Sequence, residues 1–67
     1  MDAAFIIRTP EVLRRTGISR SQLYALMARG HFPRAVKLSV RMVGWNRDAV
    51  EQWILSRPEV VYQKGKF

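Results

Sequence analysis

Hydrogen-bonding and cationic side chains are concentrated between residues 19 and 29, inside the stretch TGISRSQLYALMARGHFP. If this stretch is helical, with about 100° between successive residues, Leu23 and Leu26 mark a buried face, and Ser21 and Ala25 point away from it. Guanidinium, hydroxyl and amide groups beside such a narrow ridge suit the base edges and phosphates of a DNA major groove. An ordinary amphipathic surface helix has the same pattern, so the motif alone leaves both interpretations open. The candidate DNA contacts on this helix are Ser19, Arg20, Ser21, Gln22, Tyr24, Ala25 and Arg29.

Local signals predict the ends of this helix. Ser19 is a typical N-cap, and Gln22 three residues later completes a capping box. Ile18 before the cap and Leu23 at the fourth helical position are placed to form a hydrophobic staple. Gly30 supplies the left-handed residue that ends the helix.

A shorter helix is predicted immediately upstream. Thr9 is the expected N-cap, Pro10 occupies a first-turn position where no amide is required, and Glu11 faces the positive end of the helix dipole. The helix should run to about Thr16, where Gly17 breaks it. Two short helices joined by a glycine-containing turn form a helix-turn-helix.

After the second helix the apolar pattern becomes alternating. Val36 and Leu38 are expected to face the core on either side of an outward Lys37, and Val43-Gly44-Trp45 resumes the pattern after a short connection. This predicts a two-stranded hairpin, or wing, with Arg41 near its tip. Beside a helix-turn-helix, the candidates for a second contact, in the adjacent minor groove or on the backbone, are Lys37 and Arg41. An arginine at a hairpin tip is also a common aid to solubility.

A third helix is predicted to begin at Asn46 or Arg47 and to stop before Pro58. Trp53 on this helix and Trp45 on the second strand occupy inward positions. Core packing is therefore favoured over base stacking for both rings.

The expected fold is mainly α with a small β-hairpin, a winged helix-turn-helix of three helices and a two-stranded wing. Residues 1–57 are expected to form this DNA-binding domain, and residues 58–67 a C-terminal tail. Phe5-Ile6-Ile7 is too short an apolar run for its type to be decided from periodicity.

The charge distribution favours a polyanionic partner. The formal net charge is +7 and the sequence pI about 11.2, and nine Lys and Arg residues lie between Arg8 and Arg47 against one acid, Glu11. A basic surface also suits a membrane, but the apolar residues here are needed for a core. The expected phosphate contacts, which set register and affinity without reading sequence, are Thr9, Arg14, Arg15 and Arg34.

The composition argues against metal, redox and catalytic sites. The chain has no cysteine and its one histidine is His31, expected in an exposed loop, so no zinc ligand set is available. Ser, His and Asp occur without a nucleophile elbow, and no apolar run approaches the length of a membrane span. We expect a soluble, cytoplasmic protein that is not an enzyme and has no cofactor, no membrane partner and no small-molecule substrate.

The sequence resembles the AlpA-like prophage regulators, which are related to phage excisionases and more distantly to the DNA-binding half of MerR-type proteins. The elements TGISRS, FP and VGW occur in the family's order, and the resemblance spans residues 9 to 57. The matching residues are Thr16-Gly17-Ile18-Ser19-Arg20-Ser21, Leu23-Tyr24, Met27, Gly30, Phe32-Pro33, Val36, Leu38, Val43-Gly44-Trp45, Val50 and Trp53.

The resemblance implies a small winged-helix DNA binder, carried by a prophage or an integrated island. It implies that Arg41 is the wing residue, and that the groove-facing start of the second helix comprises Ser19, Arg20, Ser21 and Tyr24. The sequence departs from the family at Ala25, where a longer polar or basic residue is common, and at His31, where an acidic or small residue is common.

Two functions are open at this point. The first is a sequence-specific binder of double-stranded DNA that regulates transcription of an integrase gene, or assists excision as a directionality factor. Integrase is then a possible second partner, several copies are expected to associate cooperatively on the DNA, and the protein is expected at the nucleoid. The alternative is a small adaptor whose basic face binds an acidic protein such as an integrase.

Overall fold

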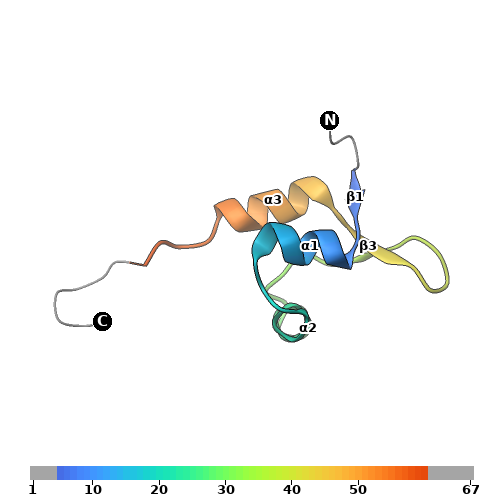
Figure 1. Cartoon of the computed structure of the whole chain (residues 1–67), viewed down its shortest axis with the longest axis horizontal. Helices are drawn as coiled ribbons and strands as arrows, with labels where there is room; N and C mark the ends of the chain where they lie inside the picture. Colours follow the sequence, from blue (N-terminus) through green and yellow to red (C-terminus); the bar gives the residue numbers. More distant parts are fainter. Residues whose placement is uncertain (1–4, 61–67) are drawn as a thin grey trace.

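The computed structural model describes residues 5–60, which form three helices and a small antiparallel sheet with strand order β1-β3-β2 (Figure 1). The mainly α fold with a small β component agrees with the sequence prediction, but the sheet has three strands because the undecided run before the first helix pairs with β3. The start of the expected domain and most of the expected tail, residues 1–4 and 61–67, lie outside the described residues. In chain order the elements are β1 (Ile6–Ile7), α1 (Thr9–Thr16), α2 (Arg20–Ala28), β2 (Val36–Lys37), β3 (Val43–Asn46) and α3 (Arg47–Leu55).

Helix α1 begins one residue earlier than the sequence predicts. Its N-cap is Arg8, in extended backbone without a side-chain cap, and the Val12 amide donates to the Arg8 carbonyl at 3.0 Å. The prediction that Thr9 caps this helix is therefore wrong. The fixed φ of Pro10 and its missing amide suit the second helical position as well as the first, so Thr9 joins the helix. The end is as predicted, with Gly17 in the left-handed region at φ 78°.

Hydrogen bonds close both ends of α2. At its start, Ser19 Oγ accepts from the Gln22 amide at 3.1 Å, and the Ser19 amide donates to Gln22 Oε1 at 2.8 Å. At its end, Gly30 adopts φ 73° and the His31 amide donates to the Leu26 carbonyl at 2.8 Å, as in a Schellman motif. The predicted capping box and glycine stop are confirmed.

The core takes a side chain from nearly every element. The ring of Phe32 meets Trp45 edge-on at 6.5 Å between centroids and lies 4.8 Å from the ring of Trp53. Trp53 Nε1 donates to the His31 carbonyl at 2.7 Å, which joins α3 to the segment that follows α2. Both tryptophans therefore pack in the core, as predicted. The buried hydrophobic residues are Ile7, Val12, Leu23, Phe32, Trp45 and Val50.

The pairing of β3 determines which strand residues face the helices. Ile7 pairs with Trp45 and both are buried, so they mark the inner face of the sheet. Lys37 pairs with Val43, which lies two positions before Trp45 and so on the same face of β3. Lys37 therefore lies on the inner face of the sheet. Val36 and Leu38 lie on the outer face and are 39% and 43% exposed, so the prediction that they face the core is wrong. The hairpin extends beyond the helices (Figure 1). Its apolar side chains are therefore not required to face the core.

Gly44 lies at the centre of the outer face, where the strands approach each other closely. A Cβ atom at this position would lie 2.5 Å from Ile6 Cγ2 and 3.0 Å from the Ile7 carbonyl oxygen. The absence of a side chain at Gly44 therefore allows Ile6 to cover the sheet and β1 to pair with β3.

We predict that Ser19→Ala lowers the free energy of unfolding by about 1 kcal/mol, because the amides at the start of α2 lose their acceptor. Urea unfolding followed by circular dichroism measures the change. Ser21→Ala, an exposed first-turn substitution outside the capping box, should change stability by less than about 0.5 kcal/mol. Equal losses in the two variants would contradict the assigned cap.

We also predict that Gly44→Ala lowers the free energy of unfolding by about 1–3 kcal/mol, because the new methyl group collides with Ile6. Combining it with Ile6→Ala should restore part of the loss, since the colliding Cγ2 atom is then absent. Strictly additive losses in a double-mutant cycle, measured by the same urea titration, would show that the collision is not the cause.

Candidate nucleic-acid interface

The side of α2 opposite the core is open to solvent. Leu23 is fully buried between the helix and the core, whereas Tyr24 is 50% exposed. No acidic residue lies in the first turn of α2, so nothing there offsets the positive end of its dipole. The exposed polar and small side chains on this helix and its C-cap include Arg20, Ser21, Tyr24, Ala25 and Arg29.

Two of the predicted DNA contacts, Ser19 and Gln22, are already engaged within the protein. Their side chains bind each other's backbone amides, and Ser19 Oγ also lies 3.4 Å from Ser21 Oγ. A base that took the Gln22 oxygen as its partner would have to open the capping box. These residues therefore serve to position Arg20 and Ser21, which occupy the first turn of the helix.

The hairpin carries the second group of candidates. Its turn is closed by a bond from the Met42 amide to the Ser39 carbonyl at 3.3 Å, which places Val40 and Arg41 at the centre. Lys37 and Arg41 are both exposed, and Lys37 lies on the sheet face that the helices cover further along. Val40, which the sequence pattern does not single out, is the most exposed large hydrophobic residue among residues 5–60.

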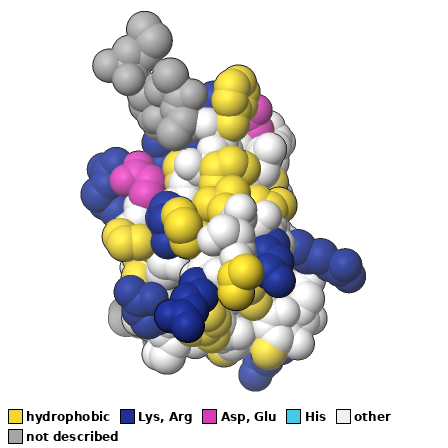
Figure 2. Space-filling view, turned by 90° about the vertical axis from the view of Figure 1, so that its right-hand side faces the viewer, with side chains coloured by type: hydrophobic (Ala, Val, Ile, Leu, Met, Phe, Trp, Pro, Cys, Tyr) yellow, Lys and Arg dark blue, Asp and Glu magenta, His cyan; other side chains and the backbone are white. Residues whose placement is uncertain are grey.

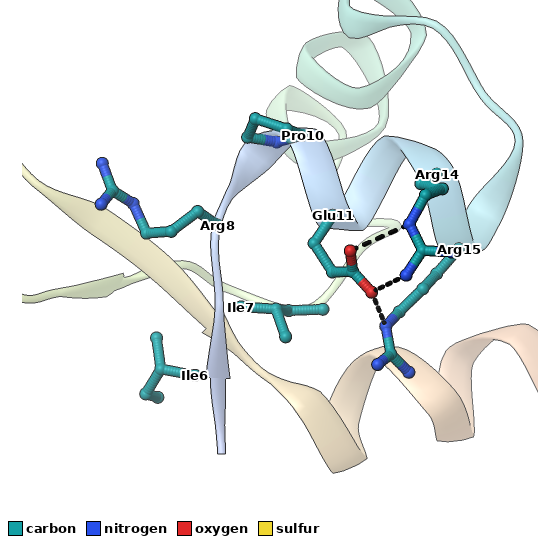
Figure 3. Close-up of a pocket in the computed structure, with 7 residues that line it drawn as sticks. All are labelled: Ile6, Ile7, Arg8, Pro10, Glu11, Arg14 and Arg15. Carbon is teal, nitrogen blue, oxygen red and sulfur yellow. Dashed lines mark hydrogen bonds and ion pairs between the residues drawn. The ribbon is translucent and has the colours of Figure 1, made fainter. Parts of the chain in front are cut away.

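The predicted phosphate contacts of α1 are partly engaged by a carboxylate. Glu11 accepts from Arg14 Nε at 3.0 Å and from Arg15 Nε at 2.7 Å, beside a pocket of about 530 Å³ between β1 and α1 (Figure 3). The hydrogen bonds from Arg14 and then Arg15 lower the pKa of Glu11. Arg15 also pairs with Glu51 of α3, and its side chain is only 20% exposed. Arg15 thus ties α1 to α3, whereas the sequence predicts a residue facing phosphate.

The remaining predicted phosphate contacts differ in accessibility. Arg14 keeps a largely exposed side chain beside its ion pair, and Arg34, between α2 and β2, is exposed. Thr9 is half-buried in the first turn of α1. Arg57, which is outside the predicted set, stacks over the ring of Trp53 at 4.1 Å from the centroid.

Charge is distributed unevenly over the surface. No Asp or Glu occurs between Arg20 and Arg47, the segment that contains α2 and the hairpin. Figure 2 views the molecule from the hairpin end, and its lower half, where α2 lies in Figure 1, carries Lys and Arg side chains without a visible acid. The acids that are visible lie in the upper half. The lower part of the face seen in Figure 2 is therefore cationic.

Other chemistry has little support in the described part of the chain. Within residues 5–60, no group of three His, Cys, Asp or Glu side chains is placed to hold a metal ion. None of the helices in that range has the length and apolar character needed to cross a membrane. His31 lies exposed after α2, as predicted.

Comparison with known proteins gives a consistent assignment. The chain is 39% identical over 51 residues to the uncharacterized protein ORF88 of Enterobacteria phage P4. The aligned region covers 76% of this chain and 58% of ORF88, so the chain spans little more than half the length of that relative. It is 28% identical over 65 residues to the DNA-binding transcriptional activator AlpA of Escherichia coli K12, over 88% of this chain and 93% of that protein. No solved structure matches. The sequence pattern of the family described as the prophage CP4-57 regulatory protein (AlpA) matches residues 5–58, a range that includes every element from β1 to α3. The chain belongs to the AlpA family of prophage regulatory proteins.

Proposed function

We propose that this chain is a transcriptional regulator of prophage origin that binds double-stranded DNA. The observation that carries the proposal is the exposed, acid-free surface formed by α2 and the hairpin, between Arg20 and Arg47. The Escherichia coli relative, named a DNA-binding transcriptional activator, supports it over 93% of that protein's length.

In the proposed complex α2 lies in a major groove as the second helix of a helix-turn-helix. Its N-terminal turn approaches the base edges, where Arg20 can donate two hydrogen bonds to a guanine and Ser21 one to a base or phosphate. The small side chain of Ala25 permits close approach, while Tyr24 and Arg29 contact the walls of the groove. Because Ser19 and Gln22 hold the start of the helix, the backbone that carries Arg20 is fixed before DNA binds.

The hairpin acts as the wing of a winged helix-turn-helix in this proposal. Lys37 and Arg41 reach the adjacent minor groove or backbone, and Arg14, Arg34 and the Thr9 hydroxyl contact phosphates. We leave Arg15 out of the interface because Glu11 and Glu51 hold it between α1 and α3. The list of proposed contacts is thus shorter than the sequence prediction by Arg15 and by the two capping residues, Ser19 and Gln22.

The proposed biological role is regulation of an integrase gene, assistance of excision as a directionality factor, or both, in the cytoplasm at the nucleoid. A domain of this size makes few contacts alone, so we propose that several copies bind adjacent sites cooperatively and that integrase is a further partner. Footprinting upstream of the neighbouring integrase gene and at the attachment site tests this role. Protection at neither site would contradict it.

One observation favours a second function, that of a protein-binding adaptor. The hairpin exposes apolar side chains on its outer face, including Val36 and Leu38, and these suit a protein partner. The two functions differ in their dependence on salt, because only DNA binding releases condensed counterions.

We predict that the affinity of the chain for duplex DNA falls steeply with salt. With about five phosphates neutralised, the logarithm of the association constant should fall against the logarithm of the salt concentration with a slope of about −4 to −5. Fluorescence anisotropy with a duplex selected from a random library by the wild-type chain measures the slope. A slope near zero, or no binding to any duplex, would favour the adaptor.

We predict different effects for Arg20→Ala and Arg41→Ala on the same duplex. Loss of Arg20 should weaken specific binding by about 1–3 kcal/mol and relax base preference, because a contact to base edges is removed. Loss of Arg41 should reduce the salt slope by about 1 with less change in preference. Arg57→Ala is the matched control, because the same substitution removes the same charge two residues beyond α3, outside the proposed interface. Wild-type binding by both test variants would show that the interface is misplaced.

A further inference from the structure

The centre of the hairpin turn holds an apolar side chain that the fold does not use. Val40 is 87% exposed, more than any other large hydrophobic residue among residues 5–60, and it is outside the core cluster. Turn centres favour Gly, Asn, Asp, Pro and Ser, and β-branched side chains are stiff and poorly suited to them. Val40 therefore contributes nothing visible to the stability of the hairpin.

The surroundings of Val40 are cationic as well as apolar. Arg41 follows it at the tip, Met42 is 40% exposed beside it, and Lys37 lies further down the same hairpin. A protruding apolar side chain beside Arg and Lys is the composition of proteins that insert a wedge into the minor groove.

The size of the tip distinguishes DNA from a protein partner. A stable protein interface buries about 800 Å² on each partner, which a turn with two central residues does not offer. The minor groove is about 6 Å wide and admits individual side chains. Val36 and Leu38 lie four and two residues before Val40, and neither is at the centre of the turn.

We propose that Val40 is an apolar wedge that enters the minor groove, partly unstacks one base step and bends the DNA. This inference rests on the proposed DNA-binding function. Arg41 supplies attraction to the groove, whereas Val40 supplies the deformation. The wedge favours flexible pyrimidine–purine steps over stiff A-tracts at the position it enters, so the hairpin reads sequence through deformability without a hydrogen bond to a base.

The experiment compares four forms of the full chain on the duplex that the wild type selects from a random library. These are wild type, Val40→Ser, Arg41→Ala and the control Leu55→Ser, which replaces an apolar residue that is 75% exposed at the end of α3. Bend angle is measured by energy transfer between end labels, and unstacking by the fluorescence of 2-aminopurine placed at each adenine under the hairpin. Thermal unfolding confirms that each variant is folded.

Wild type and Leu55→Ser should bend the duplex equally and raise 2-aminopurine fluorescence at one step. Val40→Ser should lose at least half of the bend and the fluorescence signal, with an unchanged salt slope. Replacing the unstacked step by a stiff A-tract should weaken wild-type binding by about 10-fold or more and Val40→Ser binding by much less.

Two results overturn the inference and leave the proposed function standing: a bound duplex that stays straight, or a bend that Val40→Ser retains. If the wild type binds no duplex at all, the proposed function fails and the wedge fails with it.

Discussion

The burial of Trp45 between the sheet and the helices is the contact on which the rest of the structure depends. β3 is the central strand, so the inward direction of the Trp45 ring decides the face of every residue that pairs with β3. Ile7 and Lys37 lie on the inner face of the sheet, and Val36 lies on the outer face. The Nε1 group is buried without a hydrogen-bond partner among residues 5–60, and an unpaired buried donor costs about 1–3 kcal/mol. Apolar contact therefore holds the ring, and the direction of the ring also decides that Lys37 lies on the inner face of the sheet.

Local signals were sufficient where a few neighbouring residues decide the structure. The capping box of Ser19 and Gln22 and the left-handed glycines 17 and 30 act within one helical turn, so the sequence predicted the ends of both helices to within a residue. The hairpin faces were not predictable in this way. The alternation of Val36, Lys37 and Leu38 suggests an inward apolar face only if the core extends under the strand, and here it does not. β1 was undecided because two residues cannot show a period, and its pairing partner is 40 positions away at Asn46.

The candidate site was predictable in outline for a similar reason. Outward residues of a well-delimited helix follow from its buried face, and Arg20, Ser21 and Tyr24 are exposed as expected. A sequence does not show whether an arginine meets solvent or a distant carboxylate. Arg15 pairs with Glu51, 36 residues away, and only the packing of α1 on α3 brings the two together. Capping side chains carry the same ambiguity, because the atoms that suit a base also suit the amides of their own helix.

The distribution of acids links the stability of the domain to the proposed partner. None of the five acidic residues lies between Arg20 and Arg47, so the cations of α2 and the hairpin have no carboxylate within their own segment. In a chain of 67 residues with a net charge of +7 and no disulfide, their mutual repulsion opposes folding. A polyanion bound to this surface removes the repulsion, and a ligand present at 100 times its dissociation constant stabilises the folded state by about 2.7 kcal/mol. The cations that weaken the isolated domain are those proposed to hold it on DNA, whereas Glu11 and Glu51 are placed where α1 and α3 must pack.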